Sequence, residues 1–149
     1  MGRALAKDLE QPWVDTDHLL EASEKKDLKE LLQTLGPEGF ISMEGRVLEE
    51  VQLEGHVISS GGSLVYSEGA MEHLQLTSFI LFLNTPLVDL EKRLGNLEDR
   101  GTVRQPGQSL ASLTAERLPL YRHYADLEVD TQGLNQKDLL LQLREKLKL

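Results

Sequence analysis

MGRALAKDLEQPWVDTDHLL, residues 1–20, decides how the rest of the chain is interpreted. Leu5, Leu9 and Trp13 are spaced four residues apart and share one face of a predicted helix. Pro12 ends that helix, because proline has no backbone N–H and clashes with the preceding turn. Trp13 opens a short apolar pair, which predicts a strand that ends at the sequence D-T-D. The stretch therefore predicts a helix, a strand and two carboxylates at the strand's end.

The alternation of helix and strand continues to the other end of the chain. We expect helices over 18–35, 39–52, 68–76, 86–94 and 109–124, a closing helix from Asn135, and strands over 56–60, 79–83 and 127–129. The run 79–83 is apolar without alternation, which favours a strand covered on both faces. The sequence thus predicts one α/β domain over 1–149, an open parallel sheet with helices on both faces.

Composition narrows the classes of partner and site. The chain has 149 residues, 16 basic and 25 acidic side chains, a net charge of −9 and no cysteine. This charge argues against binding of nucleic acid or an anionic bilayer, and the absence of cysteine excludes disulfides and thiolate metal sites. The apolar run 79–83 is far shorter than the roughly twenty residues of a membrane span. We expect a cytoplasmic monomer that binds a small molecule.

Polar residues and glycines follow the predicted strands, where ligands bind in open parallel sheets. Asp15 and Asp17 point the same way at one strand end, so that one can order water around Mg²⁺ while the other accepts from a substrate hydroxyl. An alternative is that Asp17 only caps the next helix. Gly61 and Gly62 follow the second strand and allow close backbone approach, although a plain turn explains the dipeptide equally well. Segment 95–108 is polar and glycine-rich, which predicts a lid loop.

Several motifs resemble those of the shikimate kinases, which are small P-loop kinases. Gly2, Arg3, Leu5 and Ala6 match the sequence G-R-x-L-A that follows the phosphate loop in that family, and the D-T-D of residues 15–17 matches the end of its next strand. The likeness covers essentially the whole chain with its motifs in order. It implies a P-loop kinase fold and ATP-dependent phosphorylation of a hydroxyl on a small carboxylic acid, namely shikimate.

The resemblance assigns roles to single residues. It implies that Asp15 lies near Mg²⁺ and that Asp17 and Arg117 are the catalytic residues, with Asp17 on the substrate hydroxyl and Arg117, within R-x-P-L-Y, on the substrate carboxylate. Gly61, Gly62 and Ser63 would contact the substrate, the glycines through their backbone. For ATP, the resemblance implies a lid arginine at Arg100 and an adenine-side loop at Thr131. Taken without this context, both arginines are explained as solvated side chains.

Two positions depart from the family's pattern. Ser63 stands third in the family's Gly-Gly-Gly stretch, so a side chain enters where none is expected. In the frame F-R-x-x-E-x-x-V-L, Phe40 and Glu44 match, but Ile41 occupies the place of an arginine that helps to hold the substrate carboxylate. Arg46 is five residues further on and on a different helix face. These departures favour, as an alternative, a sister kinase for another small hydroxylated acid.

The sequence G-x-x-x-x-G-K-[ST] occurs nowhere in residues 1–149. The resemblance therefore implies that the first, central strand and the phosphate loop, about twenty residues, precede residue 1. Without that strand, the strands near Ile58 and Phe79 would each lack a partner on one edge, and we expect residues 1–149 to fold poorly alone. A third hypothesis is an inactive remnant or interaction module. The coding region upstream of Met1 separates these hypotheses.

Overall fold

The computed structural model describes residues 1–94 and 102–148. Its elements, in chain order, are α1 (Gly2–Asp8), β1 (Trp13–Asp15), α2 (Thr16–Glu24), α3 (Leu28–Glu49), β2 (Val57–Ser59), the 3₁₀ turn η1 (Leu64–Tyr66), α4 (Glu68–Thr77), β3 (Leu81–Asn84), α5 (Leu87–Leu94), α6 (Leu110–Tyr124), β4 (Leu127–Asp130) and α7 (Gln136–Leu147). Within these residues, no helix has both the length and the apolar character needed to cross a membrane.

The four strands form two parallel pairs. β1 pairs with β2, with Trp13 opposite Val57, and the Trp13 indole N–H donates to the Ser59 hydroxyl at 2.9 Å. β3 pairs with β4, with Leu81 opposite Leu127. In the part of the chain that the structure describes, β2 and β3 are not hydrogen-bonded to each other. Each of these strands therefore has one hydrogen-bonded neighbour among the described strands.

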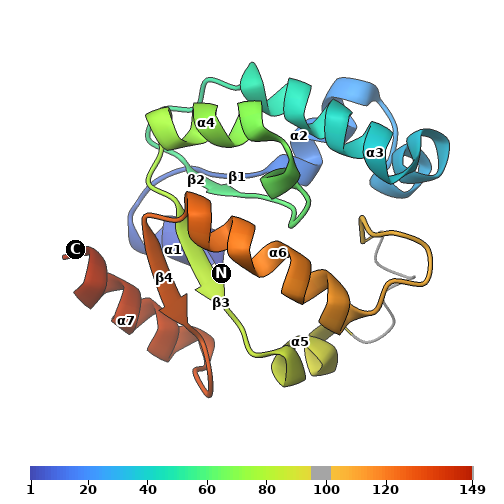
Figure 1. Ribbon diagram of the computed structural model, residues 1–149. Helices are drawn as coiled ribbons and strands as arrows, with labels where there is room; N and C mark the ends of the chain where they lie inside the picture. The colour runs from blue at the N-terminus through green and yellow to red at the C-terminus, as the bar shows by residue number, and fades with distance from the viewer. Residues whose placement is uncertain (95–101, 149) are drawn as a thin grey trace.

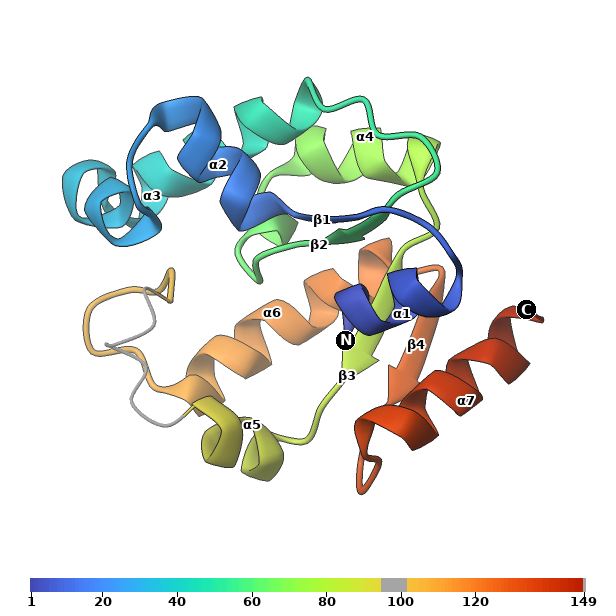
Figure 2. The same cartoon turned by 180° about the vertical axis from the view of Figure 1, so that it is seen from behind.

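Helices pack on both faces of the strands (Figures 1 and 2). On one side, α3, α4 and α6 meet in an apolar cluster that includes Leu48, Leu64 and Met71. On the other side, α1 and α7 pack against β4 through Leu5, Val129 and Leu143. A third cluster joins α2 and α3 to Val103 of the segment that precedes α6. The α/β fold with helices on both faces is therefore confirmed.

Strand β3 is covered from both sides, as its continuous apolar sequence predicts. Leu81 and Leu83 pack into the cluster formed by α1, β4 and α7. Phe82 points the opposite way and stacks on Tyr121 of α6, with ring centroids 5.1 Å apart. Successive side chains of a strand alternate between faces, so both faces of this strand must be apolar.

The helices near the N-terminal end differ from the prediction of 18–35 and 39–52. Helix α2, which corresponds to the start of the predicted helix 18–35, ends at Glu24 because Lys25 adopts a left-handed conformation, with φ 54°. Asp27 then caps α3 by accepting from the Glu30 N–H at 2.7 Å. The expected break at Gly36 is present as a kink within α3, since Gly36 has φ 69° and ψ 176°. The boundary between α2 and α3 is thus set by local capping, which the spacing of apolar residues does not reveal.

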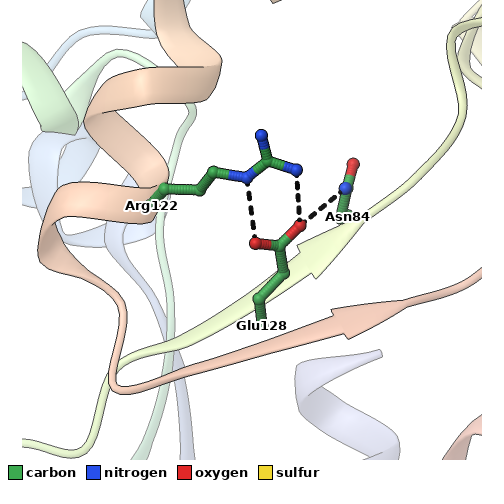
Figure 3. A network of polar contacts seen from close by, with 3 residues as sticks. All are labelled: Asn84, Arg122 and Glu128. Carbon is green, nitrogen blue, oxygen red and sulfur yellow. Dashed lines mark hydrogen bonds and ion pairs between the residues drawn. The ribbon is translucent and has the colours of Figure 1, made fainter.

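The end of α6 is tied to the second strand pair by a polar network (Figure 3). The Arg122 guanidinium makes two parallel hydrogen bonds of 3.0 Å to the Glu128 carboxylate, and Asn84 donates to the same carboxylate at 2.8 Å. These hydrogen bonds, with that of Arg122 first, lower the pKa of Glu128. The network therefore links the end of α6 to β3 and β4 at the protein surface.

Gly45 is a point of close contact between α3 and the start of α4. A Cβ atom on Gly45 would lie 2.2 Å from Ser67 Oγ and 3.0 Å from Ser67 Cβ. We expect Gly45→Val to lower the free energy of unfolding by about 1–3 kcal/mol, because the two helices would have to separate. Chemical denaturation measures the change. Removing the obstruction with Ser67→Gly should recover part of the loss in the double variant, and a fully additive double variant would contradict this packing.

Candidate active site

The predicted carboxylates lie at the carboxyl end of β1. Asp15 is the N-cap of α2, and its Oδ1 accepts from the Asp17 N–H at 3.1 Å. The cap is therefore Asp15, so the alternative in which Asp17 merely caps the helix is wrong. Asp17 lies in the first turn of α2 with its side chain half-buried. Its carboxylate is left for another role.

The surroundings of Asp17 favour its protonated form more than water would. Burial is the largest cause, and the negative charges of Asp15 and Glu21 add to it, so the pKa of Asp17 is raised above its ordinary value of 3.8. A carboxylate with a raised pKa is a stronger base than an exposed one. Asp17 is accordingly suited to accept a proton from a hydroxyl group.

The loop after β2 brings backbone against the side chains of α2, α3 and α6. A Cβ atom on Gly61 would lie 3.2 Å from Glu44 Oε1 and 3.5 Å from Asp17 Oδ1. A Cβ atom on Gly62 would lie 2.8 Å from the Tyr121 hydroxyl and 2.9 Å from Arg117 Nη1. The loop can approach these groups so closely because both residues are glycine.

Ser63, the third residue of this loop, is buried and bonded to a buried carboxyl. Its hydroxyl donates to Glu44 Oε2 at 2.6 Å, and Glu44 is only 1% exposed. Glu44 Oε1 has no hydrogen-bond partner among the described residues. Burial raises the pKa of Glu44 above its ordinary value of 4.5, and the hydrogen bond from Ser63 partly opposes this. Among the described residues, the Ser63 hydroxyl is thus the hydrogen-bond donor that the Glu44 carboxyl has.

Arg117 of α6 is buried with several partners. Its guanidinium donates to the Val103 carbonyl and, at 3.4 Å through Nε, to the Tyr66 hydroxyl. It also lies over the Tyr66 ring, 5.3 Å from the ring centroid. These contacts hold the guanidinium with Nη1 toward Gly62. The solvated-arginine alternative is therefore wrong for Arg117, which is only 6% exposed.

A small pocket of about 190 Å³ lies beside Arg117, next to the described part of the predicted lid. Its walls combine apolar and polar side chains, namely those of Pro37, Ile41, Tyr66, Val103, Arg104, Gln105, Gln108, Leu113 and Glu116. Ile41 also packs against the cluster that contains Val103. The residue at the departing position 41 therefore anchors segment 102–108 through apolar contact.

The two residues predicted for ATP have different outcomes. Arg100 lies outside the described residues, as does the first half of the predicted lid, 95–101. Thr131 follows β4 and is buried, with its hydroxyl 2.9 Å from that of Thr85 and its N–H bonded to the Asn84 carbonyl. Thr131 thus joins the ends of β3 and β4, and its role toward adenine stays a prediction.

Magnesium fits the carboxylate at position 15. No group of three or more metal-binding side chains occurs within residues 1–94 and 102–148. In phosphoryl-transfer sites, however, Mg²⁺ takes one or two carboxylates and completes its shell with phosphates and water. Asp15 uses Oδ1 for the helix cap and lies two residues before Asp17. A single carboxylate at this strand end is the donor set that such an ion requires.

Comparison with known proteins gives the family. The sequence profile described as shikimate kinase matches residues 1–148. The chain belongs to the shikimate kinase family. It is 30% identical over 143 residues to a shikimate kinase of Rhizobium meliloti, covering 94% of this chain and 74% of that protein. It is 33% identical over 133 residues to a shikimate kinase of Aromatoleum aromaticum, covering 87% of this chain and 76% of that protein.

Solved structures agree with this assignment. A shikimate kinase from Acinetobacter baumannii in complex with shikimate superposes with a TM-score of 0.87 and 26% identity, covering 99% of this chain and 84% of that one. Shikimate kinases transfer a phosphoryl group from ATP to a hydroxyl of shikimate in aromatic amino acid biosynthesis. The chain is thus a phosphotransferase of the shikimate kinase type, with the P-loop kinase fold.

Three side chains of the site were not predicted as site residues. Glu44 was noted only as a match to a family frame, and its buried, half-satisfied state depends on the loop that folds onto it. The Tyr121 hydroxyl donates to the Gly62 carbonyl at 2.9 Å, and Tyr66 lies under Arg117. The sequence R-x-P-L-Y placed Tyr121 one helical turn after Arg117, which was the available signal.

Glu44 should make stability depend on pH. Its pKa is higher in the folded protein than its ordinary value of 4.5, so the folded state holds the proton more tightly than the unfolded state does. The contribution of Glu44 to the free energy of unfolding is then greatest below pH 4.5 and is lost as the pH rises through the pKa of Glu44 in the folded protein. We expect Glu44→Gln to gain in Tm relative to the unmodified protein as pH rises from about 4 to 8. Thermal unfolding followed by circular dichroism tests this, and a pH-independent difference in Tm would contradict it.

Proposed function

We propose that Asp17, the loop 61–63 and Arg117 form the acceptor site for shikimate. Asp17 accepts the proton of the reacting hydroxyl as its oxygen attacks the γ-phosphorus of ATP, and the bond to the ADP oxygen breaks. Arg117 binds the carboxylate with two parallel hydrogen bonds, and the backbone of Gly61 and Gly62 contacts the ring. The convergence of these three segments at the carboxyl ends of β1 and β2 carries the proposal.

For the phosphate donor, we propose Asp15 as a ligand of Mg²⁺, directly or through water. When bound, the ion would neutralise charge on the transferring phosphoryl group. Arg100 and Thr131 are proposed to contact ATP on the lid and adenine sides. We further propose that the protein acts as a monomer in the cytoplasm, which gel filtration and cell fractionation would test.

The proposal is tested in two steps, because residues 1–149 contain no G-x-x-x-x-G-K-[ST] sequence. Calorimetric titration with shikimate, on the protein produced from its own gene and without ATP, measures the acceptor site alone, and we expect saturable, one-to-one binding. A coupled assay of ADP release, on the protein produced from its own gene, then measures transfer. Lack of shikimate-dependent ADP release in that protein would overturn the proposed function.

One observation favours a second acceptor. Ile41 packs against the cluster that contains Val103 and contributes no charge, and Arg117 is the guanidinium that lies near Gly62. Loss of a buried ion-pair partner costs several kcal/mol, so the absence of an arginine at position 41 would weaken the binding of shikimate. A panel of small hydroxylated acids decides between these acceptors. If another acid gives a much higher kcat/KM than shikimate, the chain is a sister kinase for that acid.

A further inference from the structure

The charges around the acceptor site do not balance. Asp17 on α2 and Glu44 on α3 bring two carboxyls within 3.5 Å of a single point beside Gly61. Arg117 on α6 brings one guanidinium to the same loop, at Gly62. With both carboxyls ionised, these three groups carry a net charge of −1 before an anionic acceptor arrives. Such an arrangement opposes the binding of another carboxylate.

Position 41 is where a second cation would restore the balance. Residues 41 and 44 are three apart on α3, so an arginine at 41 would be within reach of the Glu44 carboxyl. Ile41 instead packs against the apolar cluster that contains Val103. The Glu44 carboxyl is met by a neutral hydroxyl, that of Ser63, at 2.6 Å. A hydroxyl satisfies one oxygen but supplies no charge.

The remaining oxygen of Glu44 is the place for a proton. Glu44 is 1% exposed and its Oε1 has no hydrogen-bond partner in the described part of the chain. An isolated buried carboxylate is far more costly than a buried carboxylic acid, so such groups take up a proton instead. Ser63 donates to Oε2 and therefore leaves Oε1 as the oxygen that accepts it.

We propose that Glu44, positioned by Ser63, takes up a proton from solvent on Oε1 when the carboxylate of the acceptor binds, and so substitutes for a second cation in this site. This inference rests on the proposed function, because it concerns how that acceptor is bound. Protonation removes one negative charge from the site as the ligand brings one in. Acceptors with a carboxylate then bind through Arg117, with an affinity that falls as pH rises.

Within residues 1–94 and 102–148, the other titratable or charged groups that act on Glu44 or are affected by it are Asp17, Arg117 and Tyr121. Asp17 raises the pKa of Glu44 and Arg117 lowers it, and burial is the larger cause that keeps it raised. Tyr121 stays neutral at the relevant pH, since burial raises its pKa further above 10.0. Asp17 and Glu44 both have a raised pKa, so the variant Glu44→Gln identifies which of the two carboxyls takes up the proton.

Calorimetric titration with shikimate, in buffers of different ionisation enthalpy, measures the protons taken up per ligand bound. For the unmodified protein we expect uptake of up to about one proton per shikimate bound. We also expect the affinity to fall by up to about tenfold per pH unit above the pKa that Glu44 has in the ligand-free protein. Glu44→Gln should abolish the uptake and flatten the pH profile. Ile41→Arg should do the same and also tighten binding, because it supplies the missing charge.

Ser63 has variants that separate positioning from packing. Ser63→Ala removes the hydrogen bond that favours ionised Glu44, so the proton is already present in the free protein and uptake on binding should shrink. Ser63→Thr keeps the hydroxyl and should retain the uptake. In the free protein, carbon NMR of the Glu44 carboxyl should give a pKa above 4.5, higher in Ser63→Ala and lower in Ile41→Arg.

The outcomes distinguish this inference from the proposed function. Shikimate binding without proton uptake, uptake that persists in Glu44→Gln, or a Glu44 carboxyl that titrates at its ordinary value would overturn the inference and leave the function standing. If shikimate does not bind but another hydroxylated acid does, the proposed function is overturned and the same proton count on that acid decides the inference. If no acid binds, both are overturned. Should Ile41→Arg fail to fold, Glu44→Gln and the NMR titration carry the test.

Discussion

Replacing Arg117 with methionine should weaken shikimate binding by about thirtyfold to a few thousandfold. The guanidinium is the buried cation at the loop 61–63, and loss of one partner from a buried, hydrogen-bonded charge pair costs about 2–5 kcal/mol. Each 1.4 kcal/mol corresponds to about tenfold in affinity. Calorimetry with shikimate measures the loss for Arg117→Met. Methionine is similar in length and apolar, so the variant removes the charge while keeping much of the packing.

Two further variants control this result. Arg117→Lys keeps the charge but loses the planar two-point contact, so we expect an intermediate affinity. Arg122→Met removes an arginine from the same helix, one whose guanidinium is bound to Glu128 and lies away from the loop. It should bind shikimate as the unmodified protein does. If Arg117→Met and Arg122→Met bind shikimate equally well, Arg117 is not the carboxylate ligand.

Asp17→Asn should reduce kcat by about a hundredfold to ten-thousandfold and change the binding of shikimate much less. An amide has nearly the shape of a carboxylate and can still hydrogen-bond a hydroxyl, but it cannot take the proton from it. General base catalysis contributes a factor of this size. Steady-state kinetics of ADP release, together with calorimetry, separate the two effects. The raised pKa of Asp17 predicts in addition that kcat rises with pH around a value above 3.8.

The matched control is Glu21→Gln, one turn further along α2. Glu21 Oε1 accepts from the Leu28 N–H at 3.2 Å, which glutamine can also do. Glu21 raises the pKa of Asp17, so its neutralisation should shift the pH profile of kcat to lower pH without lowering the plateau. A fall of kcat in Glu21→Gln as large as in Asp17→Asn would mean that the helix, rather than the Asp17 carboxylate, is responsible.

The fold followed from local patterns where those patterns were strong. The apolar run 79–83 predicted a strand with two covered faces, and Phe82 and Leu83 do point to opposite apolar clusters. Asn135 caps the last helix by accepting from the N–H groups of Lys137 and Asp138, as its position predicted. Side chains at such places decide the local conformation by themselves, so the sequence was sufficient.

Other features depend on contacts between distant segments. The break at Lys25 arises from a left-handed residue and an aspartate cap, which apolar spacing does not record. The 3₁₀ turn Leu64–Tyr66 forms where the loop after β2 packs on α3 and α6. Likewise, Glu44 becomes a buried carboxyl only because Ser63, 19 residues further on, folds onto it. No pattern within one segment shows such a pairing.

Only part of the site was predicted, because the other part depends on contacts between distant segments. Asp17, Gly61, Gly62 and Arg117 were identified by resemblance, and the structure brings them to one loop. Ser63 was recognised only as a departure, and its contact with Glu44 gives that departure a physical role. The link between Ile41 and Val103 could not be inferred, since it depends on where segment 102–108 lies.

We propose, above all, that the loop 61–63, Asp17 and Arg117 together bind the acceptor. Titration of the ¹⁵N-labelled protein with shikimate, followed by NMR, tests it most directly because it needs no turnover. We expect saturable shifts that are largest for the N–H groups of Gly61, Gly62 and Ser63, with the Arg117 side chain shifting at the same shikimate concentration. An absence of saturable shifts at these groups, or saturable shifts confined to a distant element such as α7, would contradict it.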